Sequence, residues 1–230
     1  MKFSLYPISI FSLFNLLFSS VPSDSVVSKC SVTPKIENVR DFPNHMNLSN
    51  NLRRKTGSFE SASGTNISIY GRLLDKNCLP VTDAIIEVWQ TNSHGVYQEE
   101  NEDESSDLGS NIDKHFIGSG TTSTNNMGQF HFITILPGSY KGSTPFINVS
   151  VTFPSLHNFK TKIYFNHRGR SIVDDAIESV PEAMRSLLLA NPYNSNMKIN
   201  HKIPHDKNNA NDKIYIFDIV VEEKLVNKVY

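Results

Sequence analysis

The run Pro137–Val151 limits the fold of this chain most strongly, because a turn leads there into strict alternation. The run begins with a Pro-Gly pair, and Gly142 marks a second turn. From there Phe146, Asn148 and Ser150 fall on one face of a period-two pattern, and aliphatic side chains fall on the other face. This pattern predicts a β-strand whose aliphatic face lies in a core.

Similar alternating runs recur along the chain and are separated by turn residues. One short segment, residues 182–190, instead combines helix formers with an apolar cluster, and it predicts a short helix. Many short strands with so little helical periodicity predict an all-β fold, an antiparallel β-sandwich with an N-terminal extension and one short helix. The other runs that we interpret as strands are residues 66–72, 84–90, the stretch around residues 130–132, 159–165 and 213–222.

The first 23 residues have the layout of a secretory signal peptide. Lys2 supplies a positive start, Phe3–Phe18 is an apolar run without charge, and Val21–Ser23 offers small residues for cleavage. The alternative is an uncleaved anchor, but the apolar run is shorter than the roughly 20 residues of a spanning helix, and Pro7 interrupts it. We therefore expect an exported protein, periplasmic or secreted, that starts near Asp24 and keeps no stable membrane anchor.

Composition divides the remainder into a polar N-terminal extension at residues 24–60, the sandwich at residues 61–222 and a tail at residues 223–230. Export would allow the two cysteines, Cys30 and Cys78, to form a disulfide, and two free thiols are the alternative. The formal net charge of the 230 residues is −1, so charge indicates no nucleic-acid partner and no acidic membrane surface.

Two long motifs in the predicted strands and their loops resemble the intradiol ring-cleavage dioxygenases, the catechol and protocatechuate type. The first motif covers residues 71–98, GRLLDKNCLPVTDAIIEVWQTNSHGVYQ, and the second runs from residue 116 to residue 140. The matching positions in the first motif are Gly71, Asp75, Pro80, Val81, Ala84, Glu87, Trp89, Asn92, Gly95 and Tyr97. So many matches at fixed spacing indicate common ancestry, and the resemblance implies the β-sandwich of that family.

The resemblance also implies a metal site, because the family binds a non-haem ferric ion through two tyrosines and two histidines. Its metal loop reads close to PG-x-Y-x-G-R-T-P-H-I-H-V, and Tyr140 falls on the tyrosine of this pattern. Tyr97 falls on the family's other tyrosine, whereas Phe146 and Asn148 fall on the two histidines and Ser143 on the arginine. The frame of the motif is intact, but half of the ligand set is replaced.

These replacements leave two hypotheses for function. The first is an exported intradiol dioxygenase-like protein that opens catechol-type aromatics with O₂ and Fe(III) through an altered site, with His94, His157 or His167 as a substitute ligand. The second is a non-enzymatic pseudoenzyme that uses the same sandwich to bind a ligand or a protein partner.

The residues favour the second hypothesis, because Phe146 cannot ligate a metal and Asn148 offers only a neutral amide. If the cavity is otherwise preserved, the substitutions Phe146→His and Asn148→His together should complete the ligand set and restore iron colour, because both side chains leave one strand face.

Overall fold

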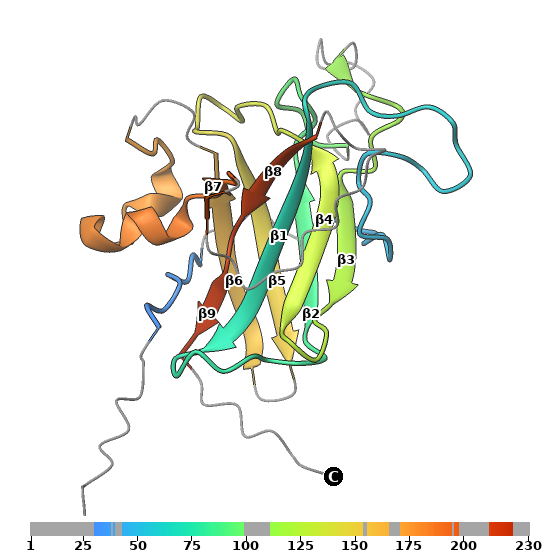
Figure 1. The fold of residues 1–230 in the computed structure, drawn as a ribbon. Coiled ribbons are helices and arrows are strands. Elements are labelled where there is room, and N and C mark those ends of the chain that lie inside the picture. Colours follow the sequence, from blue (N-terminus) through green and yellow to red (C-terminus); the bar gives the residue numbers. More distant parts are fainter. Residues whose placement is uncertain are drawn as a thin grey trace, which may run out of the picture.

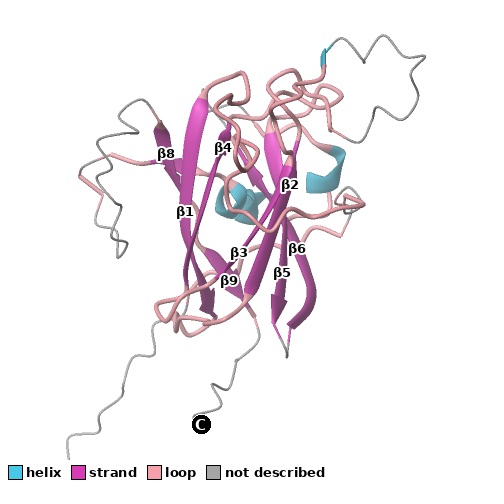
Figure 2. Cartoon of the chain, turned by 90° about the vertical axis from the view of Figure 1, so that its right-hand side faces the viewer, coloured by secondary structure: helices cyan, strands magenta, loops and turns pink. Residues whose placement is uncertain are grey.

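Two β-sheets pack face to face in this computed structural model, which describes residues 30–37, 39, 43–98, 111–153, 156–165, 171–194, 196–197 and 212–222 (Figures 1 and 2). One sheet has the strand order β4-β1-β8-β7 with β9 also on β1, and the other has the order β3-β2-β5-β6. The strands are β1 (Asn66–Asp75), β2 (Ile85–Gln90), β3 (Ser119–Ser123), β4 (Gln129–Ile135), β5 (Phe146–Phe153), β6 (Leu156–Tyr164), β7 (Asn191–Pro192), β8 (Lys213–Ile216) and β9 (Ile219–Val221).

The predicted β-sandwich is confirmed, with two differences in detail. β8 and β9 run parallel to β1, although the other pairings among the described strands are antiparallel. The predicted last strand is also divided, because the Asp218 carboxylate accepts the Arg72 backbone N–H at 2.9 Å and so takes the place of a ladder bond. The predicted short helix is a 3₁₀ helix, η3 (Glu182–Leu188), preceded by a 3₁₀ turn, η2 (Asp175–Ile177).

The core between the sheets follows the alternation of the strands. Ile147 and Val149 of β5 are fully buried there with aliphatic and aromatic side chains of β1, β2 and β4. Phe146 points to the opposite face of β5 and joins a second buried cluster, whose other members include Ile36, Tyr164 and Ile177. This second cluster lies under the 3₁₀ helices, so the outer face of the β5–β6 hairpin is covered as well.

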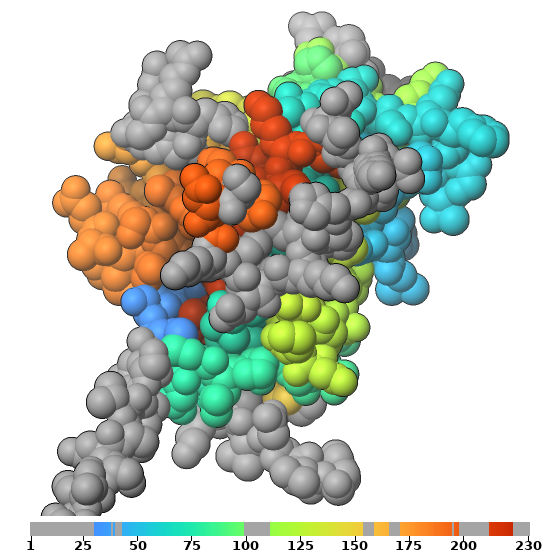
Figure 3. All heavy atoms as spheres, in the orientation of Figure 1, coloured from blue at the N-terminus to red at the C-terminus, as the bar shows by residue number. Residues whose placement is uncertain are grey.

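Residues 30–36 connect the two sheets along one edge. Cys30 forms a disulfide with Cys78, and the backbone N–H of Thr33 donates to Val220 of β9 at 2.9 Å. A few residues later the N–H of Ile36 donates to the carbonyl of a β6 residue, also at 2.9 Å. In Figure 3 these blue residues lie against the orange residues that carry the 3₁₀ helices. We call residues 30–36 the N-terminal strap.

Some expectations from the sequence concern other parts of the chain. The predicted signal peptide at residues 1–23 and the tail at residues 223–230 lie outside the described residues, as does His167. Within the described residues, no helix combines the length and the apolar character that crossing a membrane requires.

Candidate functional site

Two glycines bring the loops after β2 and β4 into direct contact. A Cβ atom at Gly95 would lie 2.1 Å from the carbonyl oxygen of Ser139, and one at Gly138 would lie 2.3 Å from the nitrogen of Gly95. Only glycine tolerates such an approach, and Gly95 also has a φ of +81°. The contact sets the rings of Tyr97 and Tyr140 edge to face, with centroids 5.1 Å apart.

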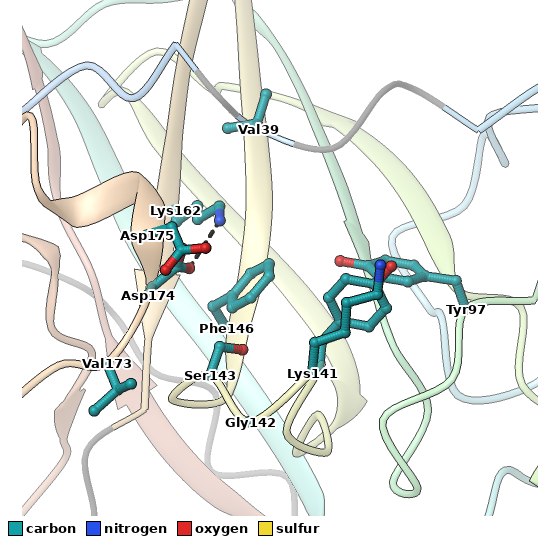
Figure 4. A pocket seen from close by; sticks show the side chains of 11 residues that line it. Val39, Tyr97, Lys141, Gly142, Ser143, Phe146, Lys162, Val173, Asp174 and Asp175 are labelled. Atoms are coloured by element: carbon teal, nitrogen blue, oxygen red, sulfur yellow. Dashed lines mark hydrogen bonds and ion pairs between the residues drawn. The ribbon is translucent and has the colours of Figure 1, made fainter.

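A cavity of about 510 Å³ opens beside the two tyrosines. Figure 4 shows Tyr97 and Lys141 on one side of it, Lys162 and Asp174 on the other, and Phe146 between them. The cavity therefore gathers residues from the loops after β2 and β4, from the β5–β6 hairpin and from the start of η2. The lining residues are Val39, Tyr97, Tyr140, Lys141, Gly142, Ser143, Phe146, Lys162, Val173, Asp174 and Asp175.

Asn148, which the motif aligns with one of the family's two histidines, is fully buried beside Tyr97. Its side-chain nitrogen donates to the Tyr97 hydroxyl at 3.0 Å and to the backbone carbonyl of Trp89 at 3.1 Å. Because a carbonyl can only accept, Trp89 fixes which end of the amide faces the phenol. The amide oxygen is buried and has no hydrogen-bond partner within the described part of the chain. Asn148 thus presents a hydrogen-bond donor to Tyr97, where the family pattern has an imidazole lone pair.

Comparison with known proteins decides the family of the chain. The family model described as Dioxygenase matches residues 40–223. A Rickettsia felis protein that carries the name dioxygenase is 36% identical over 154 residues, which are 65% of this chain and 73% of that protein. The chain belongs to the intradiol ring-cleavage dioxygenase family. The protocatechuate 3,4-dioxygenase beta chain of Burkholderia cepacia is 31% identical over 139 residues, 55% of this chain and 56% of that protein.

Solved structures with the same fold extend the comparison. The intradiol ring-cleavage dioxygenase of Tetranychus urticae has a TM-score of 0.58 at 18% identity and covers 86% of this chain and 98% of its own. The 3-chlorocatechol 1,2-dioxygenase of Rhodococcus opacus 1CP has a TM-score of 0.54 at 16% identity, covering 84% of this chain and 73% of its own. At these identities the structures support the fold, and the resemblance inferred from the two motifs is confirmed.

Two lysines line this site: Lys141 is exposed, with its Nζ 5.1 Å from the centroid of the Tyr140 ring, and Lys162 is buried. The sequence motifs of the intradiol family did not reveal Lys162. Its Nζ lies 4.0 Å from the centroid of the Phe146 ring and 2.8 Å from Oδ2 of Asp174. The side chains of this ion pair are only 6% and 8% exposed. The signal was present in the alternation of residues 159–165, which places Lys162 and Tyr164 on one face. Their partners across the hairpin, Asn148 and Phe146, became known only from the register.

Asp174 is held by three donors, so its carboxylate is fully engaged. Besides Lys162, the Tyr164 hydroxyl donates to Oδ2 at 2.9 Å, and the backbone N–H of Ala176 donates to Oδ1 at 2.9 Å. Burial, followed by the neighbouring charge of Asp174, raises the pKa of the Tyr164 phenol far above its usual range. Tyr164 therefore stays protonated and acts as a permanent donor that anchors the start of η2.

Of the three histidines considered as substitute ligands, the structure describes the positions of His94 and His157. His94 is exposed and is not among the lining residues. His157 lies at the hairpin end of β6, five residues from Lys162, which corresponds to about 16 Å along a strand. Within the described ranges, no three His, Cys, Asp or Glu residues come together in a way that could hold a metal ion.

The residues present do not fit the ferric ion of the intradiol family. Fe(III) in that family is bound by two tyrosines and two histidines. Here an amide nitrogen that donates to Tyr97 stands at one histidine position, and a phenyl ring beside an ammonium stands at the other. Ser143, at the arginine position, brings no charge. Its buried hydroxyl oxygen has no hydrogen-bond partner among the residues that the structure describes. The site thus keeps the two tyrosines of the family pattern but has no imidazole at positions 146 and 148, and it holds a buried lysine.

Proposed function

We propose that this protein is an exported, metal-free pseudoenzyme of the intradiol family, whose cavity binds a small ligand without opening its ring. The observation that carries the proposal is the hydrogen bond from the Asn148 amide to the Tyr97 hydroxyl, at 3.0 Å. An amide nitrogen has no lone pair free for a metal, so the group beside the Tyr97 hydroxyl cannot ligate iron together with it.

The walls of the cavity indicate the kind of ligand that would fit. Tyr97, Tyr140 and Phe146 present aromatic surface, and a volume of about 510 Å³ lies within the usual range of small-molecule sites. Aromatic walls favour a flat ring through edge and face contacts. The family relationship makes a catechol-type small molecule the first compound to test.

The predicted signal peptide and the Cys30–Cys78 disulfide support export. Disulfides persist in oxidising compartments and are rare in the cytosol. We expect the mature chain to start near Asp24. N-terminal sequencing of protein recovered from the periplasm or the medium tests this, and material that still begins at Met1 in the membrane fraction contradicts it.

Iron loading of the oxidised mature protein tests the absence of catalysis. The chain is offered ferric iron, desalted, and measured for bound iron, visible absorbance and oxygen uptake with catechol and protocatechuate. We expect a colourless protein with well under one iron per chain and no oxygen uptake. A family enzyme with all four ligands, treated in the same way, is the positive control. A stoichiometric, coloured ferric site in the unmutated chain would establish the alternative, an iron enzyme with a substitute histidine ligand.

Ligand binding can be followed without any chemistry, because Trp89 is the single tryptophan of the chain and its carbonyl contacts Asn148. We expect catechol-type compounds to change its fluorescence in a saturable way. The variant Tyr140→Ala removes one aromatic wall and should weaken this response, whereas Phe59→Ala, at a fully exposed site, should not. A response that is equal in both variants would place binding elsewhere.

A further inference from the structure

We propose that the Lys162 ammonium is the buried cation of this cavity, and that Lys162 and a ferric ion exclude each other. The inference builds on the proposed metal-free function and adds the residue that enforces it. It also predicts that the ancestral metal site cannot be rebuilt at positions 146 and 148 alone.

The strand register places Lys162 within the former ligand set. Asn148 pairs directly with Lys162 across the β5–β6 hairpin, and Phe146 pairs with Tyr164 on the same face. The ammonium then turns toward Phe146, 4.0 Å from its ring centroid. Lys162 therefore lies beside one replaced histidine position and over the side chain at the other.

The ammonium cannot leave this position cheaply. Lys162 is 5% exposed as a whole residue, and its Nζ lies 2.8 Å from the carboxylate of Asp174. Asp174 is itself fixed as the N-cap of η2 by the N–H of Ala176 and by the hydroxyl of Tyr164. Turning Lys162 outward would leave a buried carboxylate without its cation, which is strongly unfavourable.

Phe146 and Lys162 are chemically matched. The face of an aromatic ring attracts a cation, and the attraction grows when both groups are desolvated. An imidazole that coordinates a ferric ion repels an ammonium at this distance, because the ring then carries positive charge. A phenylalanine in place of the family's histidine is therefore compatible with the buried lysine, and in this pair of residues a side-chain cation replaces a metal ion.

The sequence alone predicts that the variant Phe146→His/Asn148→His regains iron colour, but the buried Lys162 changes this expectation. Two new imidazoles would complete the four ligands, but the Lys162 ammonium would remain beside them. We expect this double variant to bind ferric iron weakly and to show little tyrosinate-to-iron colour. Adding Lys162→Gln removes the charge with a side chain of similar length, and iron binding should then strengthen at least about 100-fold.

The matched control is Lys160→Gln in the same double variant. Lys160 lies two residues earlier on β6 and on the same face, so the substitution removes the same charge about 6.6 Å further along the strand. Iron affinity is measured by competition with a chelator, and the visible band reports coordination by tyrosine. We expect Lys160→Gln to change the affinity less than about threefold, because a more distant and less buried charge is better screened.

Because Lys162→Gln alone leaves Asp174 without its cation, that variant could misfold, and a second variant is needed. The pair Lys162→Gln/Asp174→Asn removes both charges together, and its fold is verified by near-ultraviolet circular dichroism. Equal iron affinity with and without Lys162, or no gain of iron in either folded variant, overturns the inference. Such a result is separate from a failure of the proposed function, which would be seen as bound iron in the unmutated chain.

Discussion

The Cys30–Cys78 disulfide should contribute a large part of the stability of this fold. We expect the variant Cys30→Ser/Cys78→Ser to lose about 4 kcal/mol of the free energy of unfolding. The two cysteines are 48 residues apart. A closed loop of that size lowers the entropy of the unfolded chain by about 14 cal/mol/K, which is about 4 kcal/mol at 25 °C. For a chain of this length the midpoint of thermal unfolding should fall by about 8 to 16 °C.

The same variant should also loosen the cavity locally, because the disulfide holds the N-terminal strap at its first residue. The remaining anchors are a few hydrogen bonds, among them Thr33 to Val220 and Thr161 to Pro34, each with a net contribution of about 1 kcal/mol. At the other end of the strap, Ile36 is fully buried in the second cluster, which also contains Phe146 and Tyr164. Hydrogen exchange should therefore accelerate in the strap more than in β5.

Urea unfolding of the oxidised wild type, the reduced wild type and the serine variant measures the global effect. Exchange at the amides of Thr33 and Ile36, followed by NMR or mass spectrometry, measures the local one. The reduced wild type is the control, because it lacks the cross-link but keeps both sulfur atoms. A loss below about 1 kcal/mol, together with unchanged exchange at Ile36, would refute the reasoning, because the disulfide would then constrain neither the unfolded chain nor the strap.

Three further predictions follow from buried charged and titratable groups. In urea unfolding, Lys162→Met should lower the free energy of unfolding by about 3 to 5 kcal/mol, because it leaves Asp174 without its cation. Adding Asp174→Asn should recover part of this loss, and a double variant whose loss equals the sum of the two single losses would contradict a coupled pair. Burial lowers the pKa of His131, so the unfolded state binds the proton first and the free energy of unfolding should fall as the pH drops below about 6.5. The variant His131→Gln should show a smaller dependence of stability on pH in this range, and an unchanged dependence argues against this role of His131. Burial raises the pKa of Glu87 above 4.5, so the free energy of unfolding should fall as the pH rises past that value. The variant Glu87→Gln should therefore be more stable than the wild type at pH 7 but equal to it near pH 4, and equal stability at both pH values is the contrary result.

Much of the fold could be predicted because it depends on local alternation and on turn residues. The period-two pattern of residues 146–151 correctly divides β5 between the core and the cavity face. Tyr97 follows the predicted strand at residues 84–90 and Tyr140 follows the one around residues 130–132, so the sequence also placed both tyrosines after strands. The division of the last strand could not be predicted, because it depends on a contact between Asp218 and Arg72, 146 residues apart in sequence.

The charges of the site show the same contrast. Motif spacing by itself predicted the family and aligned Phe146 and Asn148 with its two histidines, since both predictions depend on the identity of residues at fixed positions along the chain. Only the tertiary structure showed that Lys162 lies beside both Phe146 and Asp174. Lys162 meets Phe146 because two strands pair in one register, and it meets Asp174 because the chain returns to cover that hairpin. Contacts between segments depend on how the whole core packs, so a local pattern in one segment cannot specify them.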